Sequence, residues 1–177
     1  MSQRKVVFYG AISLDGFLAD YGYGLDWLMD IPAEDILNDS LTSFMKTVDT
    51  TVMGRQTFED VLKSAGEIPY KEQTNYVFTS NPIPCVLDVN YVQEDLVTFI
   101  KKLKQENGKN IWIVGGGKLL HSLIQEHLID EWYIQFAPIL LGKGIPLFGD
   151  KDTVTKLELI DSKKYQHFIE IRYRTAE

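Results

Sequence analysis

The run Ile111-Trp112-Ile113-Val114 is followed by three consecutive glycines, residues 115–117, and this junction constrains the fold more than any other stretch. Four consecutive apolar residues predict a short strand that is covered on both faces of a sheet. After the glycines, leucine and isoleucine recur at helical spacing as far as Leu128, which predicts a helix. A buried strand that turns directly into a helix is typical of α/β proteins with a parallel sheet.

Glycines at such a junction let a ligand approach the backbone closely, and the free amides of a helix start attract anions. The junction therefore predicts a phosphate-bearing cofactor, although a tight connection without a ligand fits this turn equally well when it is taken alone. Two common glycine motifs do not fit. Leu119 follows Lys118 where a Walker A loop needs Ser or Thr, and Leu120 stands where a Rossmann fingerprint needs its third glycine.

Two further strand ends carry polar residues suited to a nucleotide. The short strand Thr51–Met53 runs into Gly54-Arg55-Gln56-Thr57-Phe58, and the strand Tyr76–Phe78 ends in Thr79-Ser80-Asn81. Arg55 and Thr57 lie where a phosphate would meet a helix start. The alternative is that Thr57 caps the helix and Arg55 is solvated. Because open α/β sheets bind ligands at the carboxyl ends of their strands, the three junctions together predict a nucleotide site.

Strand and helix patterns alternate through about two-thirds of the chain, and the last two strands alternate apolar and polar residues as antiparallel strands do. We therefore predict an α/β fold in a single domain, residues 1–177, with a mixed, mostly parallel central sheet flanked by helices and a C-terminal antiparallel hairpin. The remaining predicted elements are a first strand at 6–14, a loop at 20–31, a helix at 32–48, an edge strand at 86–92, a helix from 96 to 107, a strand at 131–137, an apolar loop at 138–149 and a hairpin turn at 161–164.

Several single residues near the first strand are candidates for a site. Gly10 and Ala11 place small side chains in mid-strand, which suits either a flat ligand ring or a tightly packed helix. Asp15 and Asp26 are the candidate catalytic acids, although Asp15 fits an Asp-Gly turn equally well. Trp27 follows Asp26 and either walls a pocket or covers the edge of the core.

Composition narrows the function classes. The net charge of -7 argues against a non-specific binder of nucleic acid or anionic membranes. The single cysteine, Cys85, excludes an internal disulfide and fits a reducing compartment. With three histidines and one cysteine, no His/Cys/Cys zinc site can be assembled, and we predict no metal. No apolar run approaches the ~20 residues that span a bilayer, and the first residues do not suit a signal peptide, so we expect a cytoplasmic protein.

In order along the chain, these motifs resemble the dihydrofolate reductase-like superfamily. The specific parts are Met-Gly-Arg-x-Thr-Phe at 53–58, Thr-Ser-x-Pro at 79–82 and Val-Gly-Gly-Gly at 114–117. The segment from Pro138 to Phe148 is more similar to the reductase domain of the bifunctional riboflavin-biosynthesis deaminase-reductase and to its stand-alone homologues. The resemblance covers nearly the whole chain.

The resemblance implies that NADPH lies extended across the sheet edge and that the protein is a homodimer. The nicotinamide would contact Ala11 and Leu18, and Arg55 would be placed for the 2′-phosphate. For the loop 138–148 the sequence leaves two alternatives, burial against a second copy and packing in the core. The cofactor-binding set that the resemblance implies is Ala11, Leu18, Gly54, Arg55, Gln56, Thr57, Thr79, Ser80, Asn81, Gly115, Gly116, Gly117, Lys118 and Leu119.

One position departs from the dihydrofolate reductases. They carry an acid in the first long helix, and the matching residue here is Asn38, which cannot act as an acid. The riboflavin branch also lacks that acid. We therefore expect an NADPH-dependent oxidoreductase that transfers a hydride to a C=N or C=O of a small heterocyclic or sugar-like substrate. The alternatives are a 5-amino-6-(5-phosphoribosylamino)uracil reductase of riboflavin biosynthesis, a non-catalytic nucleotide-binding homologue, and a purely structural oligomer.

Overall fold

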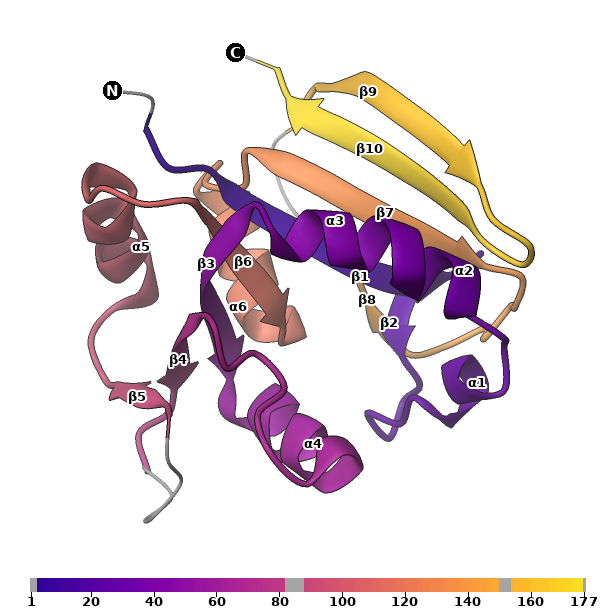
Figure 1. The fold of residues 1–177 in the computed structure, drawn as a ribbon, viewed down its shortest axis with the longest axis horizontal. Helices are drawn as coiled ribbons and strands as arrows, with labels where there is room; N and C mark the ends of the chain where they lie inside the picture. Colours follow the sequence, from indigo (N-terminus) through magenta and orange to yellow (C-terminus); the bar gives the residue numbers. More distant parts are fainter. Residues whose placement is uncertain (1–2, 82–87, 150–153, 177) are drawn as a thin grey trace.

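The computed structural model describes residues 3–81, 88–149 and 154–176, so the predictions for Cys85 and Pro82 lie outside the described residues (Figure 1). Within them, eight strands form one sheet in the order β5-β4-β3-β6-β1-β7-β10-β9. The strands of this sheet are β1 Val6–Ser13, β3 Val48–Gly54, β4 Thr74–Phe78, β5 Asn90–Val92, β6 Asn110–Gly115, β7 Glu131–Ala137, β9 Leu157–Lys164 and β10 Ile169–Thr175.

Strand directions confirm the predicted mixed, mostly parallel sheet. From β5 to β7, every neighbouring pair is parallel. Only β10 and β9 break this rule, since β10 runs antiparallel to both β7 and β9 and forms the predicted C-terminal hairpin. Parallel neighbours need crossover connections, and helices supply most of them here.

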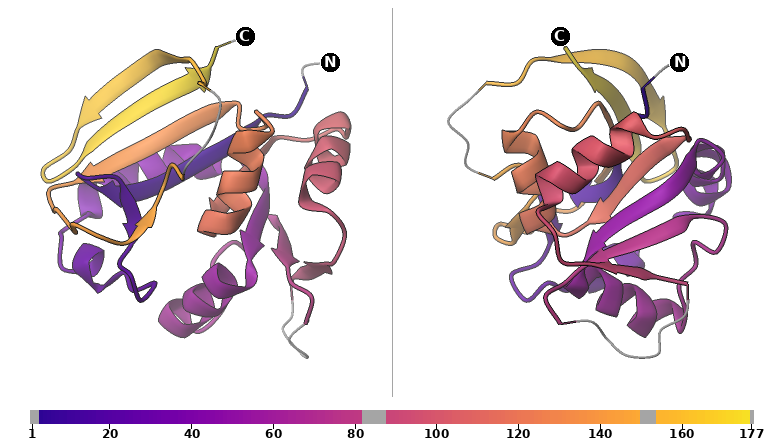
Figure 2. Two further views of the ribbon diagram at one scale, coloured as in Figure 1. Left: turned by 180° about the vertical axis from the view of Figure 1, so that it is seen from behind. Right: turned by 90° about the vertical axis from the view of Figure 1, so that its left-hand side faces the viewer.

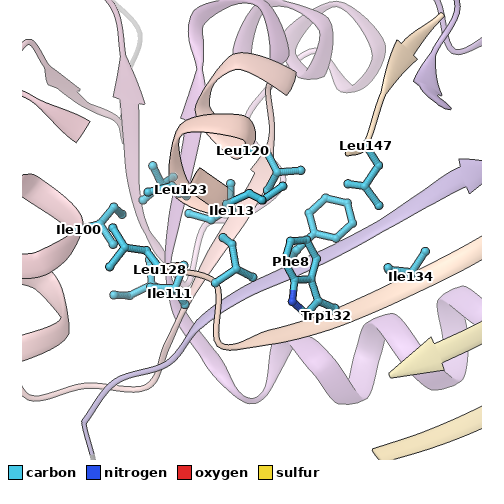
Figure 3. Close-up of a cluster of buried hydrophobic side chains, with 14 of the residues drawn as sticks. Phe8, Ile100, Ile111, Ile113, Leu120, Leu123, Leu128, Trp132, Ile134 and Leu147 are labelled. Atoms are coloured by element: carbon cyan, nitrogen blue, oxygen red, sulfur yellow. The ribbon is translucent and has the colours of Figure 1, made fainter. Parts of the chain in front are cut away.

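Helices cover both faces of the sheet (Figures 1 and 2). α5 and α6 pack on one face, where the largest core cluster includes Ile100, Leu103, Leu120 and Leu123 (Figure 3). The other face is covered by α4 and by one continuous helical segment, α2–η1–α3, which contains a π-helical turn. The helices are α1 Asp26–Met29, α2 Glu34–Ile36, η1 Leu37–Leu41, α3 Thr42–Met45, α4 Arg55–Ala65, α5 Leu96–Gln105 and α6 Gly117–Gln125.

Strand β6, which contains the apolar run Ile111–Val114, is buried on both faces, as predicted. Ile111 and Ile113 are fully buried against α5 and α6. Trp112 points to the opposite face, where its ring meets Tyr9 and Phe44 edge-on at centroid distances of 6.2 and 5.4 Å. A continuous apolar run is therefore the signature of a central strand here.

Two predicted boundaries were wrong by several residues. The helix predicted to reach Val48 ends at Met45, because residues 48–50 join β3 and pair with β6. The hairpin turn predicted at 161–164 belongs to β9, and the chain turns later, where the Tyr165 amide donates to the Phe168 carbonyl at 2.9 Å. Tyr165 and Phe168 are buried in that turn. The polar residues 161–164 predicted a turn, but they belong to a strand, β9, in which every residue is exposed and polar side chains are therefore tolerated.

Smaller corrections concern three other segments. The predicted loop 20–31 contains α1, and the predicted loop 138–149 contains β8, Ile145–Pro146, which pairs with β2, Phe17–Ala19. A Cβ on Gly144 would lie 2.2 Å from the Ala19 carbonyl oxygen, so this pairing requires glycine. Of the predicted edge strand 86–92, residues 86 and 87 lie outside the described part, and only Asn90–Val92 forms β5.

No helix among the described residues is both long enough and apolar enough to cross a bilayer.

Candidate functional site

Strand register brings the three predicted junctions together. Met53 of β3 pairs with Gly115 of β6, and Gly54 pairs with Phe78 of β4. The start of α4, the end of β4 and the start of α6 therefore lie side by side at one edge of the sheet. We call residues 54–57, 79–81 and 115–119 the rim.

The rim contains a small space, which we call the cradle, between the backbones of Gly54 and Gly116 and the side chain of Thr57. Gly116 has a φ of +102°, a conformation that residues with a side chain rarely adopt. A Cβ placed on it would lie 3.6 Å from both the Gly54 nitrogen and Thr57 Oγ1. Gly54 and Gly116 are the N-caps of α4 and α6, and neither makes a side-chain cap hydrogen bond. The first amides of both helices are therefore available to an anion.

Thr57 and Arg55 take different positions in this cradle. The Thr57 side chain lies beside Gly115 and Gly116, and within the described chain its hydroxyl has no hydrogen-bond partner. Because Gly54 is the N-cap, the alternative that Thr57 caps the helix is wrong. Arg55 is tethered rather than freely solvated, since its Nε donates to Glu59 Oε1 at 2.7 Å and its Nη1 donates to the Asn81 carbonyl at 3.2 Å.

The other predicted rim residues are exposed polar groups or close packing partners. Thr79 Oγ1 donates to the Asn81 carbonyl and accepts from the Asn81 amide, both at 3.1 Å, which fixes the turn after β4. Ser80, Gln56 and Lys118 are exposed. Leu119 would lie 3.6 Å from a Cβ on Gly54, so α6 packs closely on the start of α4.

Ala11 and Leu18 lie outside this cradle. β1 runs past its last pairing with β6, Phe8 with Ile113, and Ala11 lies in that extension at the same end of the sheet. Leu18 packs against the largest core cluster. A Cβ on Gly10 would lie 2.8 Å from Phe8 Cζ, so the Phe8 ring of the same strand, and not a neighbouring helix, fills the space beside Gly10. A flat ligand ring near Gly10 and Ala11 stays a prediction.

Asp15 and Asp26 are not brought together, and neither lies in the cradle. Asp15 accepts hydrogen bonds from the Ser13 hydroxyl at 2.6 Å and from the Leu141 and Gly142 amides at 3.1 and 2.7 Å. The Ser13 bond, helped by those amides, lowers the pKa of Asp15 below its ordinary value. An ionised carboxylate that holds a loop favours the turn role over proton donation. Asp26 is the exposed first residue of α1.

Trp27 covers the edge of the core. It packs with Ala11 and Ile36 in a cluster at the carboxyl end of β1 and β7. Its indole Nε1 is buried without an acceptor among the described residues.

Sequence reasoning missed a second polar site, which we call the helix–hairpin pocket. This cavity of about 290 Å³ lies between α2–η1–α3 and the strands β7, β10 and β9. The π-helical turn leaves Asn38 exposed and buries Ser40. One signal in the sequence could have indicated this pocket: Ser40 is a polar residue at the buried helical spacing of Ile36 and Phe44. The pocket is lined by Asp39, Ser40, Ser43, Phe44, Thr47, Tyr133, Asp161, Ser162, Lys163, Tyr165, Glu170 and Arg172.

In the described part of the chain, no group of three or more His, Cys, Asp and Glu side chains is placed to hold a metal ion.

The fold and the rim define an α/β protein whose candidate ligand site is built largely from backbone at strand ends. A family model, the RibD C-terminal domain, matches residues 4–169, and the chain belongs to that family. The uncharacterized protein YwjB of Bacillus subtilis (strain 168) is 38% identical over 175 residues, which cover 98% of this chain and 99% of that protein.

Solved structures agree with this assignment. The crystal structure of a putative riboflavin biosynthesis protein from Shewanella sp. PV-4 superposes with a TM-score of 0.86 and 31% identity, covering 98% of this chain and 99% of that one. A Thermotoga maritima diaminohydroxyphosphoribosylaminopyrimidine deaminase/5-amino-6-(5-phosphoribosylamino)uracil reductase superposes with a TM-score of 0.73. At 16% identity, with 98% of this chain and 57% of that chain covered, that likeness shows the fold alone. The predicted reductase-like fold is confirmed.

Proposed function

We propose that this chain is an NADPH-dependent reductase that delivers a hydride to a C=N or C=O of a small heterocyclic or sugar-like substrate. The observation that carries the proposal is the strand register, which places two uncapped helix starts and the turn after β4 at one edge. Membership of a reductase-like family supports the same conclusion.

The residues of the rim fit a dinucleotide. Amides at the starts of α4 and α6 would hold the pyrophosphate, and the hydroxyl of Thr57, which has no partner among the described residues, would add a donor in the cradle. Arg55 lies between α4 and the turn at Asn81, where its guanidinium suits a 2′-phosphate. The cofactor, when bound, supplies the hydride, and the chain's task is to bind and orient both reactants.

Thermal unfolding tests the cofactor assignment. A ligand that binds only the folded state stabilises it by about 2.7 kcal/mol at one hundred times its Kd, so NADPH should raise the Tm by roughly 5–10 °C. NADH should raise it less, because it lacks the 2′-phosphate that Arg55 would bind. A folded protein whose Tm does not move at millimolar NADPH would contradict the proposal.

The family membership also supports a narrower activity, that of a 5-amino-6-(5-phosphoribosylamino)uracil reductase. Growth of a bacterial strain that lacks this reductase would be restored by the gene for this chain if the narrower activity is correct. If NADPH binds but growth is not restored, the broader reductase assignment stands with a different substrate. NADPH binding without oxidation against a broad carbonyl and imine panel would instead identify a non-catalytic homologue.

We also propose a homodimer, in which the loop 138–148 contributes to the interface. Leu147 of this loop is fully buried in the core, whereas Leu140 is 71% and Phe148 45% exposed, and these exposed apolar side chains support burial against a second copy. Sedimentation equilibrium of the wild type and of a Leu140→Asp variant tests the proposal. The variant should shift the protein toward monomer, and a monomeric wild type would contradict it.

A further inference from the structure

The helix–hairpin pocket has a carboxylate, Glu170, held from behind by two uncharged donors. Glu170 Oε2 accepts from the Ser40 hydroxyl at 2.5 Å and from Gln135 Nε2 at 2.6 Å. Ser40 is 8% and Gln135 3% exposed, so both donors are buried between the helix and the sheet. Ser40 also accepts from the Tyr9 hydroxyl at 3.2 Å, which fixes the orientation of the network. Glu170 is therefore a pre-oriented anion rather than a mobile surface side chain.

The two cations of the pocket form their salt bridges with other carboxylates, although Arg172 Nε is buried without an acceptor among the described residues. Arg172 Nη2 donates to Glu131 Oε2 at 2.8 Å, and the same buried carboxylate accepts from Lys5 Nζ at 2.5 Å. Lys163 pairs with Asp39. Among the described residues, Glu170 thus makes no direct salt bridge, although it is half-buried and Lys163 lies within electrostatic range of it. A half-buried carboxylate without a direct salt bridge is costly, and a cationic ligand that pairs with it directly would relieve that cost.

Aromatic rings make up much of the remaining lining. Phe44, Tyr133 and Tyr165 all face the pocket. Burial raises the pKa of Tyr133 to about 12 and also raises that of Tyr165, so both phenols stay neutral at physiological pH. Arg172 and Lys163 already lie over the Tyr133 and Tyr165 rings, at 4.7 and 5.1 Å from the centroids. Cations are therefore compatible with these ring faces.

We propose that the helix–hairpin pocket is a binding site for a small organic cation, such as an amine or an amidine, whose charged end pairs with Glu170. The site is separate from the rim, because β1 lies between β6 and β7 in the sheet and the pocket uses β7, β10 and β9. Its occupancy therefore does not depend on the proposed reductase activity. The floor of hydroxyls and the neutral tyrosines supply further hydrogen-bond partners around the charged end.

Three probes of one shape and different charge test this proposal without cofactor. Benzamidine is cationic, benzamide is neutral and benzoate is anionic. Titrations of isotope-labelled protein, followed by amide chemical shifts, should give benzamidine the lowest Kd, at least tenfold below benzamide, with shifts centred on the pocket. Equal or tighter binding of benzoate, or no saturable benzamidine binding at tens of millimolar, would overturn the proposal.

Variants separate charge pairing from shape. Glu170→Gln keeps an acceptor for Ser40 and Gln135 but removes the charge, so benzamidine should bind at least tenfold more weakly while benzamide is unaffected. Ser43 lines the pocket from an exposed helical position, so Ser43→Trp should block both probes with the fold intact. Lys46→Trp, at the exposed end of the same helix and outside the lining, is the matched control and should bind normally. Benzamidine binding to Glu170→Gln within twofold of wild type would refute the role of Glu170.

Discussion

The rim and the helix–hairpin pocket are two polar sites built in opposite ways on one sheet. The rim is made from backbone at the ends of consecutive parallel strands, with glycine where a side chain would fill the cradle. The pocket is made from side chains that interlock across a helix and an antiparallel hairpin. A backbone site depends on local conformation, whereas a side-chain site depends on tertiary packing, so substitutions should separate the two.

The largest expected effect on the rim comes from Gly116→Ala. The strained backbone should cost about 1–3 kcal/mol of stability, and the Cβ should enter the cradle and weaken NADPH at least tenfold. Gly66→Ala is the matched control, because Gly66 has a φ of +76° at the end of α4 and open space around it. Both variants should lose stability in urea unfolding, but only Gly116→Ala should lose affinity. Equal NADPH affinities of the Gly116→Ala and Gly66→Ala variants would show that residue 116 does not line the NADPH site, and the contrast between the rim and the pocket would fail.

In the pocket, the corresponding change is Gln135→Leu. Removing one donor leaves part of Glu170 unsatisfied, which should destabilise the fold by roughly 1–3 kcal/mol. Adding Glu170→Met should recover part of that loss, because the apolar pair leaves only the Ser40 hydroxyl without its acceptor. Urea unfolding of the single and double variants measures the coupling. NADPH affinity should stay unchanged in both, and a tenfold change would show that the two sites are coupled.

Thr57→Val sharpens the description of the cradle. Valine keeps the shape but removes the hydroxyl that lies beside Gly115 and Gly116. NADPH should bind about fivefold more weakly, which corresponds to one hydrogen bond of roughly 1 kcal/mol, with little change in Tm. Thr57→Ser retains the hydroxyl and should bind NADPH as the wild type does, as calorimetric titration would show. A serine variant as weak as the valine variant would assign the effect to packing instead.

The smallest effect is expected for Asp15→Asn and depends on pH. The pKa of Asp15 is lowered from 3.8, so its contribution to stability is complete above that value and is lost as the pH falls through the lower, folded-state pKa. The variant should therefore lose less stability than the wild type on acidification from pH 5 to pH 3. Its reduction rate at pH 7 should change by only a few-fold. A loss of several orders of magnitude would restore Asp15 as the proton donor.

The contrast between the two sites also explains what the sequence could predict. The rim was predictable because its signals are local: a buried strand, glycines and a helical period follow one another at residues 111–128. The network of Ser40, Gln135 and Glu170 was not, because its members come from three distant segments and each is unremarkable alone. The hairpin turn was misplaced for a similar reason, since only tertiary packing buries Tyr165 and Phe168.

Hydrogen exchange with and without NADPH tests the central claim most directly, because it reports where the dinucleotide lies on the sheet. Slower amide exchange on binding is expected in all three rim segments, 54–57, 79–81 and 115–119, with β9 and β10 unchanged. Protection confined to the helix–hairpin pocket, or to a single junction while the other two exchange as before, would contradict a rim that binds the cofactor jointly.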